Sequence, residues 1–447
     1  MKRKTRKQLI DIIIVSILII ILIWVYNIYK RNDYSGYTKA ESTPYTSKFV
    51  RDNNIKISKY DSYQIISEEW NDALFYQKIS VKQNTPYRVT AMIKTQDVDT
   101  QNMSLNAGAQ ICISDTVEHS NVVTNTNDWQ EVELLFNSKN RTSVDISFRL
   151  GGYDDKCKGI AWFSNFKIEE GTNDKDNNWN FACFVIEKTD VTVKVNEKDK
   201  KIKLEMTNED KEIIKQNIAR FQKTCEQLSE ENMKVNYDYI EIESPLTSLS
   251  YDDENGYYVA PRDVYNILEK YLEEKEYDHI FIAVRLGDIL NKTDIIVNDW
   301  IGLGGMDYCG IAFSNIRLPN SDKDYIYRYD PRVNIFPEEV FIHEFLHTLE
   351  RNLLEIGYNI PALHDYEKYG YKNEKIIGLK KWYQDYMQCN IYSQTGEKIG
   401  LYKEVYSMKP VHKSNFNNSN VIENVLTSSK NIIEDIKNIF YAIKSYF

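Results

Sequence analysis

The sequence has few cysteines, prolines and glycines for its length. Six cysteines, nine prolines and 17 glycines occur among 447 residues, and no two cysteines form a C-x-x-C pair. The cysteine spacing therefore indicates neither a disulfide framework nor a cysteine zinc site, and leaves room for one or two bridges. With 42% hydrophobic residues, the composition is that of a globular protein, and the length predicts more than one domain.

The chain also lacks an excess of positive charge. Its formal net charge is −10, and removal of the five cations in "MKRKTRKQ" leaves about −15 on the rest. An acidic surface repels phosphate groups over a Debye length. We therefore expect no nucleic-acid partner.

A single long apolar run lies near the start of the chain. The eighteen residues from Ile12 to Tyr29 carry no charge, which predicts a membrane span. The run is longer than a signal-peptide core and no small-x-small site follows it, so an uncleaved anchor is favoured over a cleaved signal peptide. Because more cations precede the run than follow it, we expect a cytoplasmic tail (1–8), an anchor (9–29) and an extracellular remainder.

Two stretches of different character follow the anchor. Residues 30–59 are polar and aperiodic, which predicts a spacer. Residues 60–171 contain short alternating runs such as "YRVTAMI", "WQEVELLF" and "IAWFSNFKI", separated by Asn, Asp, Gly and Ser clusters. This pattern predicts an all-β sandwich.

The stretches "TNDWQEVELLF" and "GIAWFSNFKIEEG" resemble carbohydrate-binding modules of the jelly-roll kind related to families 4 and 9. The resemblance implies a possible glycan partner for this domain. Trp129 and Trp162 are the aromatic candidates for sugar contact, although large aromatics more often fill the core of a sandwich.

A mixed pattern begins after a linker at about 169–180 and extends over 180–412. Strand-like runs alternate with helical ones, among them a helix over 208–230 and a helix from Pro261 to about Lys275. A glycine-rich stretch, "DWIGLGGMDYCGIAFSNI", follows. The alternation predicts a layered arrangement of helices and strands.

The segment "HEFLHTLE" carries the chemistry of the chain. It belongs to a predicted helix that Pro337 opens and Gly357 ends, so His343 and His347 are one turn apart and project from one side. Two such imidazoles hold one zinc ion, and Glu344 is placed to reach a metal-bound water. Chance would produce H-E-x-x-H in this chain with an expected count below about 0.02.

A catalytic zinc needs a third protein ligand, which we expect in "IPALHDYEKYGYKNE". His364 is the first candidate, because its nitrogen suits zinc and it lies beyond a turn. Glu367 is the second, twenty residues after His347, and Asp365 is a candidate to orient an imidazole.

The "HEFLH" motif resembles that of the zincin metallopeptidases. The resemblance implies an α+β domain over 180–412, with a twisted sheet behind the active-site helix, an edge strand that aligns a peptide, and one Zn²⁺. The metzincin extension of the motif and a clear thermolysin-type glutamate motif are absent, so the subfamily is left open.

Four further predictions concern residues around this site. Tyr369 or Tyr371 is a candidate oxyanion donor, although both tyrosines are as well explained by packing. Glu350, one turn beyond His347, either supports the site or lies on a solvated helix face. "GIAFSNI" is the predicted edge strand for β-addition of substrate. A C-terminal amphipathic helix (420–447) packs on the peptidase domain or lies on the membrane.

These observations predict a membrane-anchored extracellular zinc metallopeptidase with Glu344 as general base and His343, His347 and His364 as ligands. Two alternatives stay open. One is a surface glycan-binding protein or adhesin with an inactive zincin domain, and the other is a zinc amidase that acts on cell-wall peptides.

Overall fold

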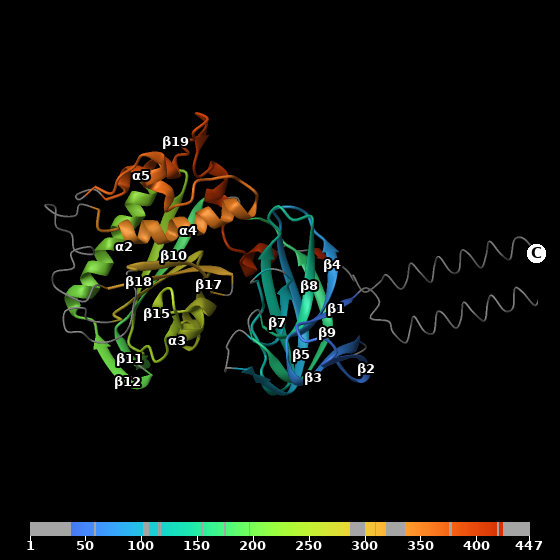
Figure 1. Ribbon diagram of the computed structural model, residues 1–447. Helices are drawn as coiled ribbons and strands as arrows, with labels where there is room; N and C mark the ends of the chain where they lie inside the picture. Colours follow the sequence, from blue (N-terminus) through green and yellow to red (C-terminus); the bar gives the residue numbers. More distant parts are fainter. Residues whose placement is uncertain are drawn as a thin grey trace, which may run out of the picture.

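A computed structural model describes residues 37–57, 60–101, 107–114, 116, 118–152, 155–173, 176–195, 197–286, 300–308, 310–318, 336–374, 378–417 and 420–422. The predicted tail and membrane anchor lie outside these residues, as does the predicted C-terminal helix beyond residue 422. In the part of the chain that is described, no helix is both long and apolar enough to cross a bilayer. The described residues form two bodies, a β-sandwich and a mixed sheet covered by helices (Figure 1).

The predicted β-sandwich is confirmed and consists of two antiparallel sheets. The four-stranded sheet has the order β1 (Thr38–Glu41), β4 (Ala73–Ser80), β8 (Ser143–Gly151), β6 (Gly108–Ile113). The other has the order β2 (Ser47–Ile57), β3 (Tyr60–Asn71), β9 (Cys157–Glu170), β5 (Pro86–Thr100), β7 (Asn125–Asn137), and β21 (Asn420–Ile422) also pairs with β9. Alternate residues of β5 (Tyr87, Val89, Ala91 and Ile93) are at most 1% exposed and face the core, as their spacing predicts.

The predicted spacer is wrong over residues 38–57. These residues form β1 and β2, which pair with β4 and β3 at the edges of the two sheets. Most side chains of β2 are exposed. Because an edge strand with two solvated faces has no apolar alternation, its sequence resembles that of a polar connection.

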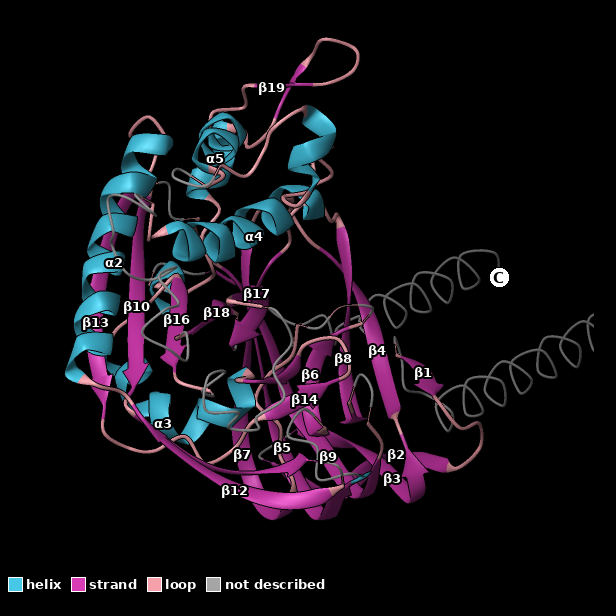
Figure 2. Ribbon diagram, turned by 60° about the vertical axis from the view of Figure 1, so that its left-hand side comes forward, coloured by secondary structure: helices cyan, strands magenta, loops and turns pink. Residues whose placement is uncertain are grey.

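The second body is built on a five-stranded sheet (Figure 2). Its order is β13 (Lys234–Ile242), β10 (Asn178–Ile186), β16 (His279–Val284), β18 (Ile311–Arg317), β17 (Gly302–Tyr308). The first four strands are parallel to one another, and β17 runs antiparallel to β18. The hairpins β11 (Lys188–Val195) with β12 (Lys198–Glu205), β14 (Ser250–Asp252) with β15 (Gly256–Tyr258), and β19 (Ile391–Tyr392) with β20 (Lys398–Ile399) are appended to it.

Helices cover both faces of this sheet. On one face lie α2 (Asn208–Leu228), α4 (Glu339–Glu355) and α5 (Lys380–Met387), and on the other lies α3 (Pro261–Glu274). The helix predicted over 208–230 is α2, which Thr207 and Asp210 begin with a reciprocal capping box. Its predicted apolar face is buried against the sheet and consists of Ile214, Ile218, Phe221, Cys225 and Leu228.

The prediction that "GIAFSNI" forms the edge strand is wrong, because the neighbouring strand lies at the edge. "GIAFSNI" forms β18, which lies between β16 and β17, and β17 is the edge strand beside it. Three glycines in β17 lower its intrinsic strand preference, so the sequence indicated only a glycine-rich stretch and predicted no strand there. The edge of the sheet is therefore the stretch Gly302–Tyr308.

The end of the described chain returns from the second body to the sandwich. We call this segment, residues 403–422, the strap. It includes the 3₁₀ helices η4 (Lys403–Ser407) and η5 (Lys413–Phe416) and ends with β21, which pairs with β9. The ring of Phe416 lies 4.9 Å from the guanidinium carbon of Arg88 in the sandwich. His412 Nε2 lies 2.9 Å from a carboxylate oxygen of Asp278, which precedes β16. The strap thus touches both bodies.

Candidate metal centre

The helix α4 presents the H-E-x-x-H motif with its apolar side against the sheet. Phe341, Ile342, Phe345, Leu346, Leu349 and Leu353 are all fully buried there. The helix begins at Glu339, two residues after the predicted start, and ends before Gly357, whose φ of 89° suits a glycine beyond a helix C-terminus. Its opposite side carries His343 and His347.

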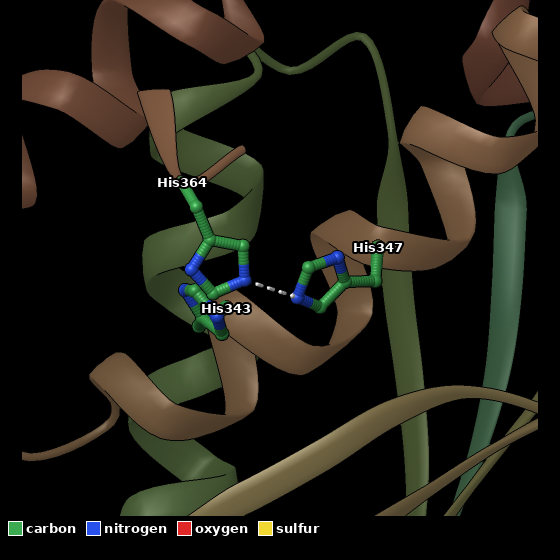
Figure 3. A group of neighbouring side chains, drawn as sticks. All are labelled: His343, His347 and His364. Carbon is green, nitrogen blue, oxygen red and sulfur yellow. Dashed lines mark hydrogen bonds between the residues drawn. The ribbon is translucent and has the colours of Figure 1, made fainter. Parts of the chain in front are cut away.

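Three imidazoles meet above this side of α4. His343, His347 and His364 each offer a ring nitrogen within 4.8 Å of the other two. The Nε2 atoms of His347 and His364 are 3.2 Å apart. Figure 3 shows that His364 reaches the helix from a separate segment, just before the 3₁₀ helix η3 (Asp365–Tyr369). The turn after α4 therefore folds back far enough to add a third nitrogen to the predicted pair.

Two of the three imidazole rings have a hydrogen-bond partner at Nδ1. Nδ1 of His343 lies 3.1 Å from the hydroxyl of Tyr383, and Nδ1 of His347 lies 3.1 Å from Oε2 of Glu350. With Nδ1 protonated and donating to these oxygens, each Nε2 keeps its lone pair for a ligand. Three neutral nitrogens that leave further positions open are a donor set that fits catalytic zinc.

The surroundings favour uncharged rings. Burial, and next the charges of His347 and His364, lower the pKa of His343 to about 3. Burial and the charge of His347 also lower the pKa of the more exposed His364. Because a metal binds the neutral imidazole, His343 and His364 are in their ligating form at neutral pH.

Glu344 is rotated about 100° round the helix from His343 and packs against the edge strand. It is 4% exposed, and it lies so close to β17 that there is no room for a side chain on two of that strand's residues. A Cβ on Gly302 would come within 2.6 Å of Cδ of Glu344, and a Cβ on Gly304 within 2.8 Å of its Oε2. The two glycines allow the carboxylate to lie directly beneath the strand backbone.

Burial raises the pKa of Glu344 to about 8, against a hydrogen bond from the backbone amide of Gly304 that lowers it. The loss of hydration penalises the charged carboxylate more than a single amide donor stabilises it. A carboxyl group with this pKa takes up and releases a proton near neutral pH, which is the requirement for a general base.

The other predicted site residues lie elsewhere. Glu367 is exposed and is not among the side chains that converge on His343 and His347. Asp365 pairs with Lys368, at 2.9 Å. The hydroxyl of Tyr371 donates to Asp385 at 2.7 Å.

Tyr369 stacks on Trp382, with the ring centroids 6.0 Å apart. Both it and Tyr371 pack against the core beside α5, as the packing alternative predicts.

Two kinds of residue in the site were not predicted. Tyr383 belongs to "KKWYQDYM", whose tyrosines and tryptophan have no spacing that distinguishes them from core aromatics. Gly302 and Gly304 stand in "GLGG", where a pair of glycines inside a strand indicates a close approach by another group. That second signal was available from the sequence.

The two candidate tryptophans of the sandwich differ in exposure. Trp162 is 3% exposed, and its indole Nε1 donates to Asp52 at 3.2 Å. Trp129 on β7 is half-buried. Trp162 is therefore part of the interior, whereas Trp129 is partly accessible to solvent.

Comparison with known proteins gives matches to solved structures only. No family model matches the chain, and no curated protein matches it. The similar structures include carbohydrate-binding modules, the class to which the sandwich sequence bears a resemblance. Each match covers about a third of this chain, so the larger part of the chain lies outside it.

Three of these modules are representative. A family 61 module solved with β-1,4-galactotriose is 16% identical over 31% of this chain and 92% of its own, with a TM-score of 0.23. A family 4 module is 18% identical over 31% and 83%, with a TM-score of 0.20. A family 22 xylan-binding domain from Paenibacillus barcinonensis is 14% identical over 30% and 85%, with a TM-score of 0.20.

Proposed function

We propose that the chain is a zinc-dependent metallopeptidase. The observation that carries the proposal is the convergence of three histidine nitrogens within 4.8 Å, next to a buried glutamate on the same helix. His343, His347 and His364 would hold the ion through Nε2. A zinc ion held there would polarise a peptide carbonyl and lower the pKa of a water molecule.

Glu344 would move the proton. In its charged form the carboxylate takes a proton from water, and in its protonated form it returns that proton to the leaving amine nitrogen. Its burial keeps these two forms close in free energy near neutral pH. The Gly304 amide, which donates to the carboxylate, would hold it in position throughout.

The edge strand β17 would align the substrate. It is the outermost strand of the sheet, it contacts α4, and its backbone passes over Glu344. An extended peptide that adds to this edge would run beside the glutamate and the three imidazoles. Arg351 Nη1 donates to the carbonyl of Gly305 at 3.1 Å, which would fix the strand to the active-site helix.

From the sequence alone, we also propose that residues 9–29 anchor the chain in a membrane with the catalytic body outside the cell. Under this proposal a soluble fragment of residues 32–447 contains the complete site. Protease accessibility of the described region on intact cells, compared with lysed cells, tests the orientation.

The decisive experiment measures zinc content and peptide cleavage together. We expect one zinc per chain in residues 32–447, metal lost in His364→Ala but kept in Glu367→Ala, and Glu344→Gln that keeps metal and cleaves nothing. A wild-type fragment without zinc, with cleavage equal in all three variants, would overturn the proposal. Unfolded proteins and cell-wall peptides, offered as separate substrates, distinguish a general protease from an amidase.

A second candidate function is glycan binding by the sandwich, and the half-buried Trp129 is the observation that favours it. An accessible indole face on a sandwich strand can stack on a sugar ring. Binding of the fragment to a panel of polysaccharides, lost in Trp129→Ala and kept in Trp162→Phe, would support this function. Equal binding by wild type and Trp129→Ala would exclude Trp129 as the contact.

A further inference from the structure

The carboxylate of Glu350 touches two separate parts of the candidate metal centre. Its Oε2 lies 3.1 Å from Nδ1 of His347, one turn earlier on α4. Its Oε1 accepts a hydrogen bond of 2.8 Å from the backbone amide of Leu363, the residue before His364. The side chain is 13% exposed, so solvent competes little for either contact.

Two side chains of α5 also form hydrogen bonds with the segment that carries His364. The indole Nε1 of Trp382 donates to the carbonyl of Leu363 at 2.9 Å, and the hydroxyl of Tyr386 donates to the carbonyl of Pro361 at 2.9 Å. Both donors are buried. The peptide groups on both sides of Leu363 are therefore fixed, one by Glu350 from α4 and the other by Trp382 from α5.

We infer that Glu350 is a positioning residue that joins the second and third ligands into one preformed site, an inference that rests on the proposed function. One carboxylate fixes both the orientation of the His347 ring and the position of the backbone before His364. Neither contact reaches the reacting atoms, so Glu350 acts only through the two histidines. The sequence left two interpretations of Glu350 open, a solvated helix face and support of the site. Because the side chain is 13% exposed, we infer the second.

The chemistry of the two contacts requires a carboxylate. The Leu363 amide and the Nδ1–H of His347 are both donors, so each needs an acceptor oxygen. A glutamine in the same place offers one oxygen and one NH₂ group, which is itself a donor. One of the two contacts would then be lost, although the side chain keeps its size and shape.

Replacement of Glu350 by glutamine would also change the tautomer of the His347 ring. A glutamine NH₂ that faces Nδ1 favours the tautomer with its proton on Nε2. That proton occupies the lone pair that the ion needs. Substitutions of such outer partners of metal ligands weaken metal affinity by about 10- to 100-fold.

The test compares wild type with Glu350→Gln and Glu350→Ala, with Glu367→Gln as the control. Glu367 is a nearby exposed glutamate, so its substitution removes the same charge from outside the site. Zn²⁺ affinity is measured by competition with a chelating dye, and the coordination number by the visible spectrum of the Co²⁺-loaded protein. In the metal-free protein, hydrogen exchange of the Leu363 amide and the ¹⁵N shifts of the His347 ring report the two contacts directly.

We expect both Glu350 variants to bind Zn²⁺ about 10- to 100-fold more weakly than wild type, and Glu367→Gln to match wild type. Leu363 exchange should accelerate in Glu350→Ala, and the His347 ring should change tautomer in at least one variant. A wild type that binds Zn²⁺, with Glu350 variants of equal affinity and unchanged Leu363 exchange, would overturn the inference alone. A wild type that binds no Zn²⁺ would instead overturn the proposed function, and the role of Glu350 with it.

Discussion

The hydroxyl of Tyr383 lies 3.1 Å from Nδ1 of His343, so a residue of α5 fixes the first imidazole of the site on α4. The same hydroxyl is hydrogen-bonded to Glu339 at the start of α4. Burial, and next the charge of Glu339, raise the pKa of Tyr383 well above its ordinary value. The phenol therefore stays protonated, accepts from the imidazole and donates to the carboxylate.

The substitution Tyr383→Phe should weaken zinc binding by about tenfold, because it leaves Nδ1 of His343 without an acceptor while the ring still fills its place. The free energy of unfolding should fall by about 1–2 kcal/mol through the lost hydrogen bonds. Dye competition and chemical denaturation measure the two effects. Tyr392→Phe, at an exposed position, is the control; equal zinc affinity in the two variants would refute the role of the hydroxyl.

In Gly302→Ala the added methyl group would collide with the carboxylate of Glu344 and displace it. A displacement of about 1 Å should lower kcat by about 100-fold. Zinc content should stay at the wild-type value, since the three atoms nearest the added Cβ all belong to Glu344 and none to an imidazole. The matched control is Gly305→Asn on the same strand, where a Cβ meets nothing within 4 Å and asparagine tolerates the φ of 78°. Full activity in Gly302→Ala would show that Glu344 does not need its present position.

The buried His279 should make the metal-free protein sensitive to acid. Burial, and next the charge of Arg351, lower its pKa from 6.5 to about 3, and its ring nitrogens face the neutral hydroxyls of Ser314 and Thr348. The unfolded state binds a proton on this residue at higher pH than the folded state does. Stability is thus complete above about pH 6.5 and is lost as the pH falls from there toward 3.

Denaturation curves at several pH values between 4.5 and 7 measure this dependence. The slope of the free energy of unfolding against pH should be smaller in His279→Gln than in wild type. His119→Gln, at a half-buried histidine of the sandwich, is the control variant. An unchanged slope in His279→Gln would mean that other groups cause the acid sensitivity.

The substitution Phe416→Ala should detach the strap from the sandwich. Phe416 is 5% exposed, and its ring contacts the guanidinium of Arg88. The loss of a buried phenylalanine costs about 3 kcal/mol. Limited proteolysis should cut residues 403–422 faster in this variant than in Lys403→Ala, where an exposed side chain of the same segment is removed. Equal rates would show that Phe416 does not hold the strap.

The helix α4 could be predicted from sequence because its determinants are local. An apolar face at helical spacing and a glycine beyond the end define α4 without knowledge of its neighbours. The choice between His364 and Glu367 could not be made, because it depends on how the chain turns after Gly357 and on contacts from α5. Those contacts join residues 19 and 25 positions apart and leave no periodic trace.

The errors in strand prediction have a common physical cause. The strands β2 and β17 both lie at sheet edges, one with mostly exposed side chains and the other with three glycines. A strand is recognised by its buried alternate residues, and neither stretch buries enough of them. The interior strand β5, whose alternate residues are buried, was predicted from "YRVTAMI".

The pairing of β21 with β9 makes the helix-covered second body an insertion within the sandwich, since residues on both sides of it contribute strands to that domain. Both ends of the described chain therefore belong to the same body. A pulling force applied between Thr38 and Ile422 would pass through the sandwich sheets and leave α4 and its histidines unloaded. Held taut at both ends, the molecule would keep the geometry of its candidate metal centre for as long as β21 stays paired with β9.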